Sequence, residues 1–134
     1  MLRLVSFFEQ GNLALLYPNK KLKTIAAIPA YNEEKFIGEV VHEAQNYVHQ
    51  IIVIDDGSTD ATAEVAAKAG TIVIRHETNK NYGGAIKSCF DASRKYNADL
   101  LVTLDGDGQH KASEIPLLIK LYRILGRIGF SGGG

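Results

Sequence analysis

The sequence predicts an α/β domain built on a mainly parallel β-sheet with helices on both faces. Four short apolar runs lie within residues 24–104, and segments of helical periodicity separate them. The runs are continuous rather than alternating, which is typical of strands that are buried on both faces of a sheet. Strands that alternate with helices in this way form parallel sheets through right-handed crossovers.

The four strands are expected where apolar runs end in turn-forming residues. The first run ends at Pro29, and the second ends at Asp55. Valine, isoleucine and leucine dominate the runs, which favours strands at these positions. The expected strands cover residues 24–28, 51–54, 71–75 and 100–104.

A segment with helical spacing follows each of these strands. Asn32 is expected to cap the first helix, whose apolar residues continue to Val48. The second helix is expected to begin after residues 58–60 and to end before Gly70, because glycine favours the position after a helix. The third helix is expected over residues 83–96, and Ser113 is expected to cap the last one.

The composition fits one compact domain and excludes several functions. Of 134 residues, 46% are hydrophobic and 22% are charged, which is typical of a globular protein. Fifteen basic residues balance fifteen acidic ones, so the chain lacks the positive charge that nucleic-acid binding requires. The single cysteine, Cys89, excludes an internal disulfide and is expected in the core. No run approaches the ~20 apolar residues of a membrane helix, and a cytoplasmic protein is expected.

The chain is expected to have three parts. Residues 24–126 form the domain, residues 1–23 an N-terminal extension, and residues 127–134 a glycine-rich tail. The extension is expected to pack on the domain. Alternatively, it lies on a membrane surface, where Lys20, Lys21 and Lys23 would face anionic lipid.

Three of the four expected strands are followed by acidic, turn-forming residues. Glu33 and Glu34 follow the first strand, Asp55 and Asp56 the second, and Asp105 the fourth. Parallel strands place their carboxyl ends at one edge of the sheet, which is where ligands bind in such folds. Carboxylates gathered at one edge repel one another unless a cation or hydrogen-bond donors join them. The sequence therefore predicts a ligand site at this edge.

The strongest metal candidate is the run Asp105-Gly106-Asp107. Two carboxylates two residues apart can turn toward one hard cation, and Mg²⁺ or Mn²⁺ prefers oxygen ligands. Gln109 offers a further oxygen, and His110 offers a nitrogen. The alternative is a solvated Asp-Gly turn without a ligand.

Other residues at this edge are candidates for nucleotide binding. One of the Asp55 and Asp56 carboxylates could accept hydrogen bonds from a base or ribose; alternatively, both only form the turn and cap the next helix. Glu33 contacts the nucleotide or stabilises a helix N-terminus. Tyr31 stacks on a base or fills a gap at the sheet edge.

Paired glycines, Gly83 and Gly84, open the third expected helix. They permit close approach of a phosphate to the helix N-terminus, although tight packing of the helix on the sheet is the simpler explanation. The histidines at positions 42, 49 and 76 lack the spacing of metal ligands and are interpreted as surface or packing residues.

Four motifs carry a resemblance to a known family. They are residues 28–34 (IPAYNEE), 53–60 (VIDDGSTD), 83–85 (GGA) and 104–110 (LDGDGQH). In this order and spacing they resemble glycosyltransferase family 2, whose members have the Rossmann-like GT-A fold. Within that family the chain looks most like the dolichyl-phosphate mannose synthase and polyprenyl-phosphate glucosyltransferase group. The resemblance covers residues 25–118.

The resemblance implies a metal-dependent, inverting transfer of a sugar from a nucleotide-diphosphate donor, of the UDP-glucose or GDP-mannose type, to a polyprenyl or dolichyl phosphate. Asp105 and Asp107 would be the catalytic carboxylates that hold Mg²⁺ or Mn²⁺. The implied donor-site residues are Pro29, Ala30, Tyr31 and Glu33 in the nucleotide pocket; Ile54 and Asp56 at the base; Gly83 and Gly84 at the helix start; and Asp105, Gly106, Asp107 and Gln109 at the metal and diphosphate.

The chain departs from this family in two respects. Lys111 and Ala112 stand where the group usually has a proline, and the sequence covers only the N-terminal, donor-binding half of the family. We therefore expect little turnover from this chain alone, and an exposed sheet edge after the fourth strand that favours self-association. A longer parent chain would act at the cytoplasmic face of the membrane. The alternatives are a non-catalytic nucleotide-sugar or metal-binding module and a nucleotidyltransferase, although the basic phosphate loop of the latter is absent.

Overall fold

The computed structural model describes residues 2–6, 21–108, 111–125 and 130–132. Strands and helices alternate over most of this length, as the sequence predicts. The elements are β1 (Leu2–Ser6), β2 (Thr24–Ala30), α2 (Ile37–Ala44), β3 (Gln50–Asp55), α3 (Thr62–Lys68), β4 (Ile72–Arg75), α4 (Asn81–Lys95), β5 (Leu100–Thr103), the 3₁₀-helix η1 (Ala112–Glu114), α5 (Ile115–Leu125) and β6 (Phe130–Gly132).

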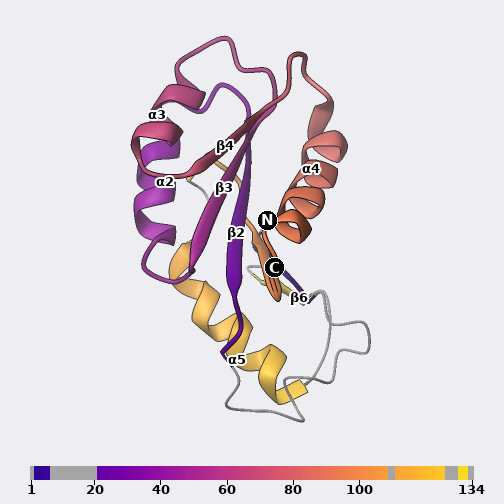
Figure 1. The fold of residues 1–134 in the computed structure, drawn as a ribbon. Helices are drawn as coiled ribbons and strands as arrows, with labels where there is room; N and C mark the ends of the chain where they lie inside the picture. Colours follow the sequence, from indigo (N-terminus) through magenta and orange to yellow (C-terminus); the bar gives the residue numbers. More distant parts are fainter. Residues whose placement is uncertain (1, 7–20, 109–110, 126–129, 133–134) are drawn as a thin grey trace.

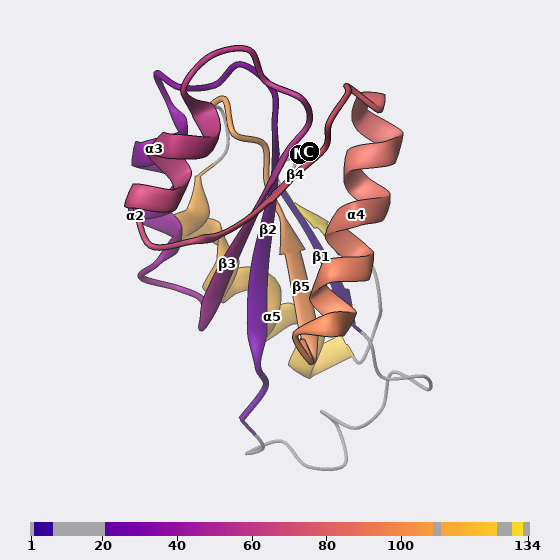
Figure 2. The same cartoon turned by 45° about the horizontal axis from the view of Figure 1, so that its top comes forward.

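A single six-stranded sheet in the order β4-β3-β2-β5-β1-β6 joins all the described strands. The four strands expected from the sequence, β2 to β5, pair in parallel. Helices α2, α3 and α5 cover one face, and α4 covers the other (Figures 1 and 2). The predicted α/β class, a mainly parallel sheet with helices on both faces, is confirmed.

The core consists of two layers, one on each face of the sheet. Along β2, Ile25 and Ala27 pack beneath α4, whereas Ala26 and Ile28 pack beneath α2, α3 and α5. Cys89 is fully buried on the α4 side, which confirms its expected core position. The strands are apolar on both faces because both faces are covered.

Strand β2 continues through Pro29, although the proline predicted that the strand ends there. The Ala27 carbonyl accepts from the backbone N–H of Leu104, just after β5, whereas the Ala30 carbonyl accepts from that of Asp56, just after β3. Because successive residues of a strand point to alternate sides, Pro29 faces β5. The last β2–β5 pair is Ala27 with Thr103, so the missing N–H of Pro29 removes no bond from the ladder.

Two expected helix caps are wrong. Asn32 has φ +52°, and its side-chain oxygen accepts from the Thr59 backbone N–H at 2.9 Å, so it joins two loops instead of capping α2. Phe36 occupies the N-cap position of α2 without a side-chain cap. Ser113 lies inside η1, where it forms part of the 3₁₀ turn that precedes α5.

The expected open edge beside β5 is also wrong. Residues 2–6, assigned to an extension, form β1 and pair antiparallel with β5, with Arg3 opposite Thr103 (Figure 2). Strand β6, from the tail, pairs with β1 in turn. Because β1 covers β5, the reason for expecting self-association at that edge is lost. The division into residues 1–23, 24–126 and 127–134 stays a prediction.

The membrane-surface alternative finds little support at Lys23. Its ammonium group donates to the Tyr96 carbonyl at 2.6 Å, so this lysine is engaged within the domain. Lys21 is exposed, and Lys20 lies outside the described residues. Within the part of the chain that the structure describes, no helix is long and apolar enough to cross a membrane.

Gly57, in the turn after β3, is a position where only glycine fits. Its φ is +77°, and an added Cβ would lie 2.8 Å from the Asn79 backbone nitrogen. We expect Gly57→Ala to lower the free energy of unfolding by about 2 kcal/mol or more, measured by urea denaturation. Gly83→Ala is the matched control, since its Cβ would meet nothing within 4 Å and alanine favours a helix. Equal stability of the two variants would contradict this explanation.

Candidate donor-binding site

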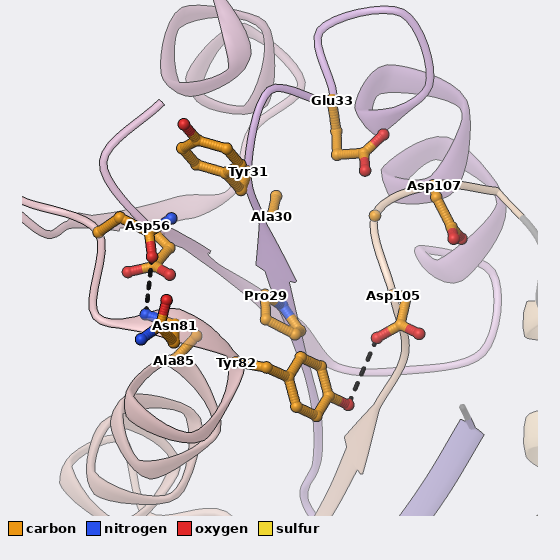
Figure 3. A pocket seen from close by; sticks show the side chains of 12 residues that line it. Pro29, Ala30, Tyr31, Glu33, Asp56, Asn81, Tyr82, Ala85, Asp105 and Asp107 are labelled. Carbon is orange, nitrogen blue, oxygen red and sulfur yellow. Dashed lines mark hydrogen bonds between the residues drawn. The ribbon is translucent and has the colours of Figure 1, made fainter. Parts of the chain in front are cut away.

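A pocket of about 420 Å³ lies at the carboxyl edge of the sheet, where β2, β3 and β5 end beside the start of α4 (Figure 3). Its position is the one expected for a ligand site in a parallel sheet. It is lined by Pro29, Ala30, Tyr31, Glu33, Asp56, Asn79, Asn81, Tyr82, Ala85, Asp105, Gly106 and Asp107.

Residues from the three acidic strand ends meet in this pocket. The end of β2 lies in the middle, with Asp56 on one side and Asp105 and Asp107 on the other (Figure 3). The structure brings together the following residues proposed from the sequence: Pro29, Ala30, Tyr31, Glu33, Asp56, Asp105, Gly106 and Asp107.

Three other proposed residues do not line the pocket. Ile54 is fully buried in the core beneath α4, and Gly83 and Gly84 lie in the first turn of α4. Their contact with a nucleotide stays a prediction. Gln109 and His110 lie outside the described residues.

The structure distinguishes the two adjacent carboxylates at the end of β3. Asp55 is fully buried, its Oδ1 accepts from the Ser58 backbone N–H at 3.1 Å, and its Oδ2 lies 3.4 Å from Arg75 Nε. Asp55 therefore holds the turn. Asp56 lines the pocket and is the carboxylate available to a ligand.

The negative charges of the pocket act on one another. Burial raises the pKa of Glu33, and the charges of Asp107, Asp60 and Asp105 raise it further. Burial also raises the pKa of Tyr82, with a further contribution from Asp105, whose Oδ1 lies 3.5 Å from the tyrosine hydroxyl. The pocket therefore favours a cation or a hydrogen-bond donor as its ligand.

The residues present fit a hard divalent cation that takes part of its ligands from the protein and the rest from a substrate and water. Asp105 and Asp107 supply carboxylate oxygens, and Gly106 lets them approach β2 closely, since an added Cβ there would lie 3.1 Å from Ala30 Cβ and 3.3 Å from Ile37. Across residues 2–6, 21–108, 111–125 and 130–132, no three His, Cys, Asp or Glu side chains form a metal-holding group. Mg²⁺ commonly binds through one or two carboxylates plus phosphate oxygens and water.

Several pocket features escaped the sequence analysis. Tyr82 and Asn81 line the pocket from the first turn of α4, next to Gly83 and Gly84. His76, interpreted as a surface or packing residue, is buried and bonds Asp56. The sequence does indicate this position of His76, because the residue directly follows the expected strand at 71–75 and must therefore lie at the same edge of the sheet. Arg3 comes from β1, and its positive charge acts to lower the pKa of Tyr82.

The raised pKa of Glu33 gives a prediction about stability. A carboxyl whose pKa is higher in the folded chain costs stability once it ionises, so the cost is absent well below its ordinary value of 4.5 and complete above the raised value. We expect Glu33→Gln to raise the melting temperature by about 2 °C near pH 7, a screened effect of about 0.5 kcal/mol. Little change is expected at about pH 3.5.

Differential scanning fluorimetry at both pH values measures this effect. Glu39→Gln is the control, because this exposed carboxylate lies in the first turn of α2 and removing it should not stabilise the chain. A Glu33→Gln variant that is stabilised equally at both pH values would contradict the electrostatic explanation.

The family match identifies the chain as a glycosyltransferase domain. The family model for glycosyl transferase family 2 matches residues 25–132, and the chain belongs to that family.

Two relatives of similar sequence carry the names of enzymes. The chain is 37% identical over 111 residues to UDP-N-acetylglucosamine–dolichyl-phosphate N-acetylglucosaminyltransferase of Methanococcus voltae, covering 69% of this chain and 44% of the relative. It is 35% identical over 117 residues to undecaprenyl-phosphate 4-deoxy-4-formamido-L-arabinose transferase of Pseudomonas aeruginosa, covering 75% and 34%. The chain spans less than half the length of the curated relatives it matches.

A solved structure supports the fold. Glucosyl-3-phosphoglycerate synthase from Mycobacterium tuberculosis, in complex with Mn²⁺, uridine diphosphate and glucosyl-3-phosphoglycerate, superposes with a TM-score of 0.64. The match covers 85% of this chain and 43% of that one at 24% identity. At this identity the similarity establishes the GT-A fold.

Proposed function

We propose that this chain binds the nucleotide-sugar donor of a metal-dependent glycosyltransferase that transfers the sugar to a polyprenyl phosphate. The observation that carries the proposal is the meeting of Asp56, Asp105 and Asp107 in one pocket at the carboxyl edge of the sheet. A nucleotide-diphosphate sugar needs an acceptor for its base at one end and neutralisation of its diphosphate at the other. The pocket has the two kinds of group on opposite sides of β2 (Figure 3).

Each pocket residue has a role in this proposal. Asp56 accepts a hydrogen bond from the base. The exposed ring of Tyr31 packs against the same base. Asp105 and Asp107 would hold Mg²⁺ or Mn²⁺, which would act as a Lewis acid and neutralise charge on the departing nucleoside diphosphate. The Tyr82 hydroxyl lies 3.5 Å from Asp105 Oδ1, beside the proposed metal site. The reaction inverts the anomeric carbon, because the acceptor phosphate oxygen attacks opposite the leaving group.

The acceptor is proposed from the relatives rather than from the pocket. The names of the two relatives above specify dolichyl and undecaprenyl phosphate, which are both polyprenyl phosphates. We place the reaction at the cytoplasmic face of the membrane, with a donor of the UDP-glucose or GDP-mannose type. A non-catalytic module that binds nucleotide sugar or metal would have the same donor pocket, and only transfer distinguishes the two.

A transfer assay tests the proposal. The chain is incubated with labelled UDP-glucose or GDP-mannose, Mn²⁺ and a short polyprenyl phosphate, and both protein-bound and lipid-linked label are counted. We expect retention of a donor on the protein. We expect lipid-linked sugar near the level of an Asp105→Asn control. Holding the acceptor in line with the donor supplies roughly 7–11 kcal/mol of catalysis, and the described pocket accounts only for the donor. Failure to retain any donor would refute the donor site, and robust transfer would exclude the non-catalytic alternative.

A further inference from the structure

The carboxylate of Asp56 is held by a chain of side chains that the proposed function does not use. Its Oδ1 lies 2.8 Å from His76 Nδ1 and accepts from the Lys80 backbone N–H at 2.8 Å. The other ring nitrogen of His76, Nε2, lies 2.8 Å from Ser88 Oγ. The His76 side chain is only 6% exposed, and both of its ring nitrogens have partners within the fold.

This arrangement leaves Asp56 with one usable oxygen. A carboxylate oxygen has two lone pairs, and on Oδ1 the imidazole and the Lys80 amide occupy both. Oδ2 accepts no hydrogen bond from the residues that the structure describes, although the Asp56 side chain is only 6% exposed and lines the pocket. Oδ2 is not among the fully buried atoms without a partner, so it is open to the pocket, where a ligand N–H can pair with it.

The order Asp56, His76, Ser88 is that of a catalytic triad, but the position of the serine excludes nucleophilic catalysis at this pocket. Ser88 is not among the residues that line it. A nucleophile must reach the substrate. Ser88, on α4, instead bonds the Nε2 atom of His76, on the side of the ring away from Asp56. The chain of bonds instead fixes the ring of His76, and through it the orientation of Asp56.

The bases of nucleotides differ in what they present to a single acceptor. Uracil has one N–H on its pairing edge, between two carbonyl groups. Guanine has two adjacent donors, N1–H and the 2-amino group, which match both oxygens of a free carboxylate. Cytosine and adenine have a ring-nitrogen acceptor beside their amino group. A carboxylate is itself an acceptor, so it repels that ring nitrogen.

We propose that His76 is a positioning residue that makes the pocket selective for uridine nucleotides. By occupying Oδ1, His76 prevents the two-point contact with guanine and leaves Oδ2 for the single N–H of uracil. This inference rests on the proposed donor site and names the donor's nucleotide. A site that holds one buried polar partner discriminates strongly against ligands that leave donors or acceptors unpaired.

The test compares nucleotides across variants of His76 by isothermal titration in Mn²⁺. The probes are UDP, GDP, CDP and inorganic pyrophosphate, which has no base. The unmodified chain is expected to bind UDP about tenfold more tightly than GDP or CDP. His76→Ala should lose this preference, with UDP weakened about tenfold. His76→Asn, whose side-chain N–H can replace that of Nδ1, should retain it, and pyrophosphate should bind all three proteins equally.

Each outcome decides one question. Equal binding of UDP and GDP by the unmodified chain, with both nucleotides bound, would overturn the selectivity and leave the donor site standing. Binding of no nucleotide would overturn the donor site itself. An unchanged preference in His76→Ala would overturn the role of His76.

A second variant covers the case in which His76→Ala does not fold. Ser88→Ala removes the partner of Nε2 but keeps the contact between His76 and Asp56. It should reduce the preference for UDP over GDP about threefold while leaving pyrophosphate binding unchanged. An unchanged preference in a folded Ser88→Ala chain would contradict the positioning role.

Discussion

Asp105→Asn and Asp107→Asn are each expected to weaken nucleotide-diphosphate binding about 100-fold in the presence of Mn²⁺. Each substitution removes one of the two carboxylates that the pocket offers to a hard cation. The sign of the effect should reverse when the cation is removed. In chelator, the carboxylates only repel the diphosphate, so either variant should bind the nucleotide as tightly as the unmodified chain or more tightly.

The reversal separates a metal site from a general loss of structure. Isothermal titration of UDP and GDP, with Mn²⁺ and with chelator, measures both halves of the prediction. Asp91→Asn is the charge-matched control, because this exposed carboxylate lies on α4 beside Lys87, outside the pocket. A variant that weakens binding equally with and without cation would contradict the metal role of Asp105 and Asp107.

Asp56→Asn is expected to weaken binding of the preferred nucleotide about 30-fold while the melting temperature changes little. The asparagine oxygen can still accept from His76 and Lys80 in the place of Oδ1. Its amide nitrogen then replaces Oδ2 and directs a donor at the donor of the base. A hydrogen bond lost to a buried group costs about 1–3 kcal/mol.

Asparagine is a sharper test than alanine at this position. Asp56→Ala would leave His76 Nδ1 and the Lys80 backbone N–H without a partner, so it should lower stability as well as affinity. Thermal melts and titrations of the two variants separate these effects. A clear drop in the melting temperature of Asp56→Asn with unchanged affinity would assign Asp56 to the turn alone.

The sheet and the gathering of acidic residues could be predicted because both follow from local patterns. Continuous apolar runs between helical segments fix a parallel sheet, and a parallel sheet brings Glu33, Asp56 and Asp105 to one edge. The structure shows the strands within two residues of the predicted bounds at the ends that carry these groups. Asp105 and Asp107 are only two positions apart in the sequence, so placing the end of this strand at the edge was enough to predict that they lie together.

The remaining features depend on contacts between distant segments. Asn32 carries a typical capping side chain, yet it bonds Thr59, twenty-seven positions away in the sequence. His76 gains its role only from Asp56 and Ser88, which other elements supply. The pairing of β1 with β5 joins residues about a hundred positions apart, and hydrophobic periodicity carries no information about such a partner.

The central claim is that the pocket binds a nucleotide sugar through a divalent cation. Its most direct test is a calorimetric titration of this chain with UDP-glucose and GDP-mannose, once with Mn²⁺ and once with chelator. At least one donor should bind with Mn²⁺, and its affinity should fall at least about tenfold in chelator. A donor that binds equally well under both conditions, or the absence of binding under either, would contradict the account.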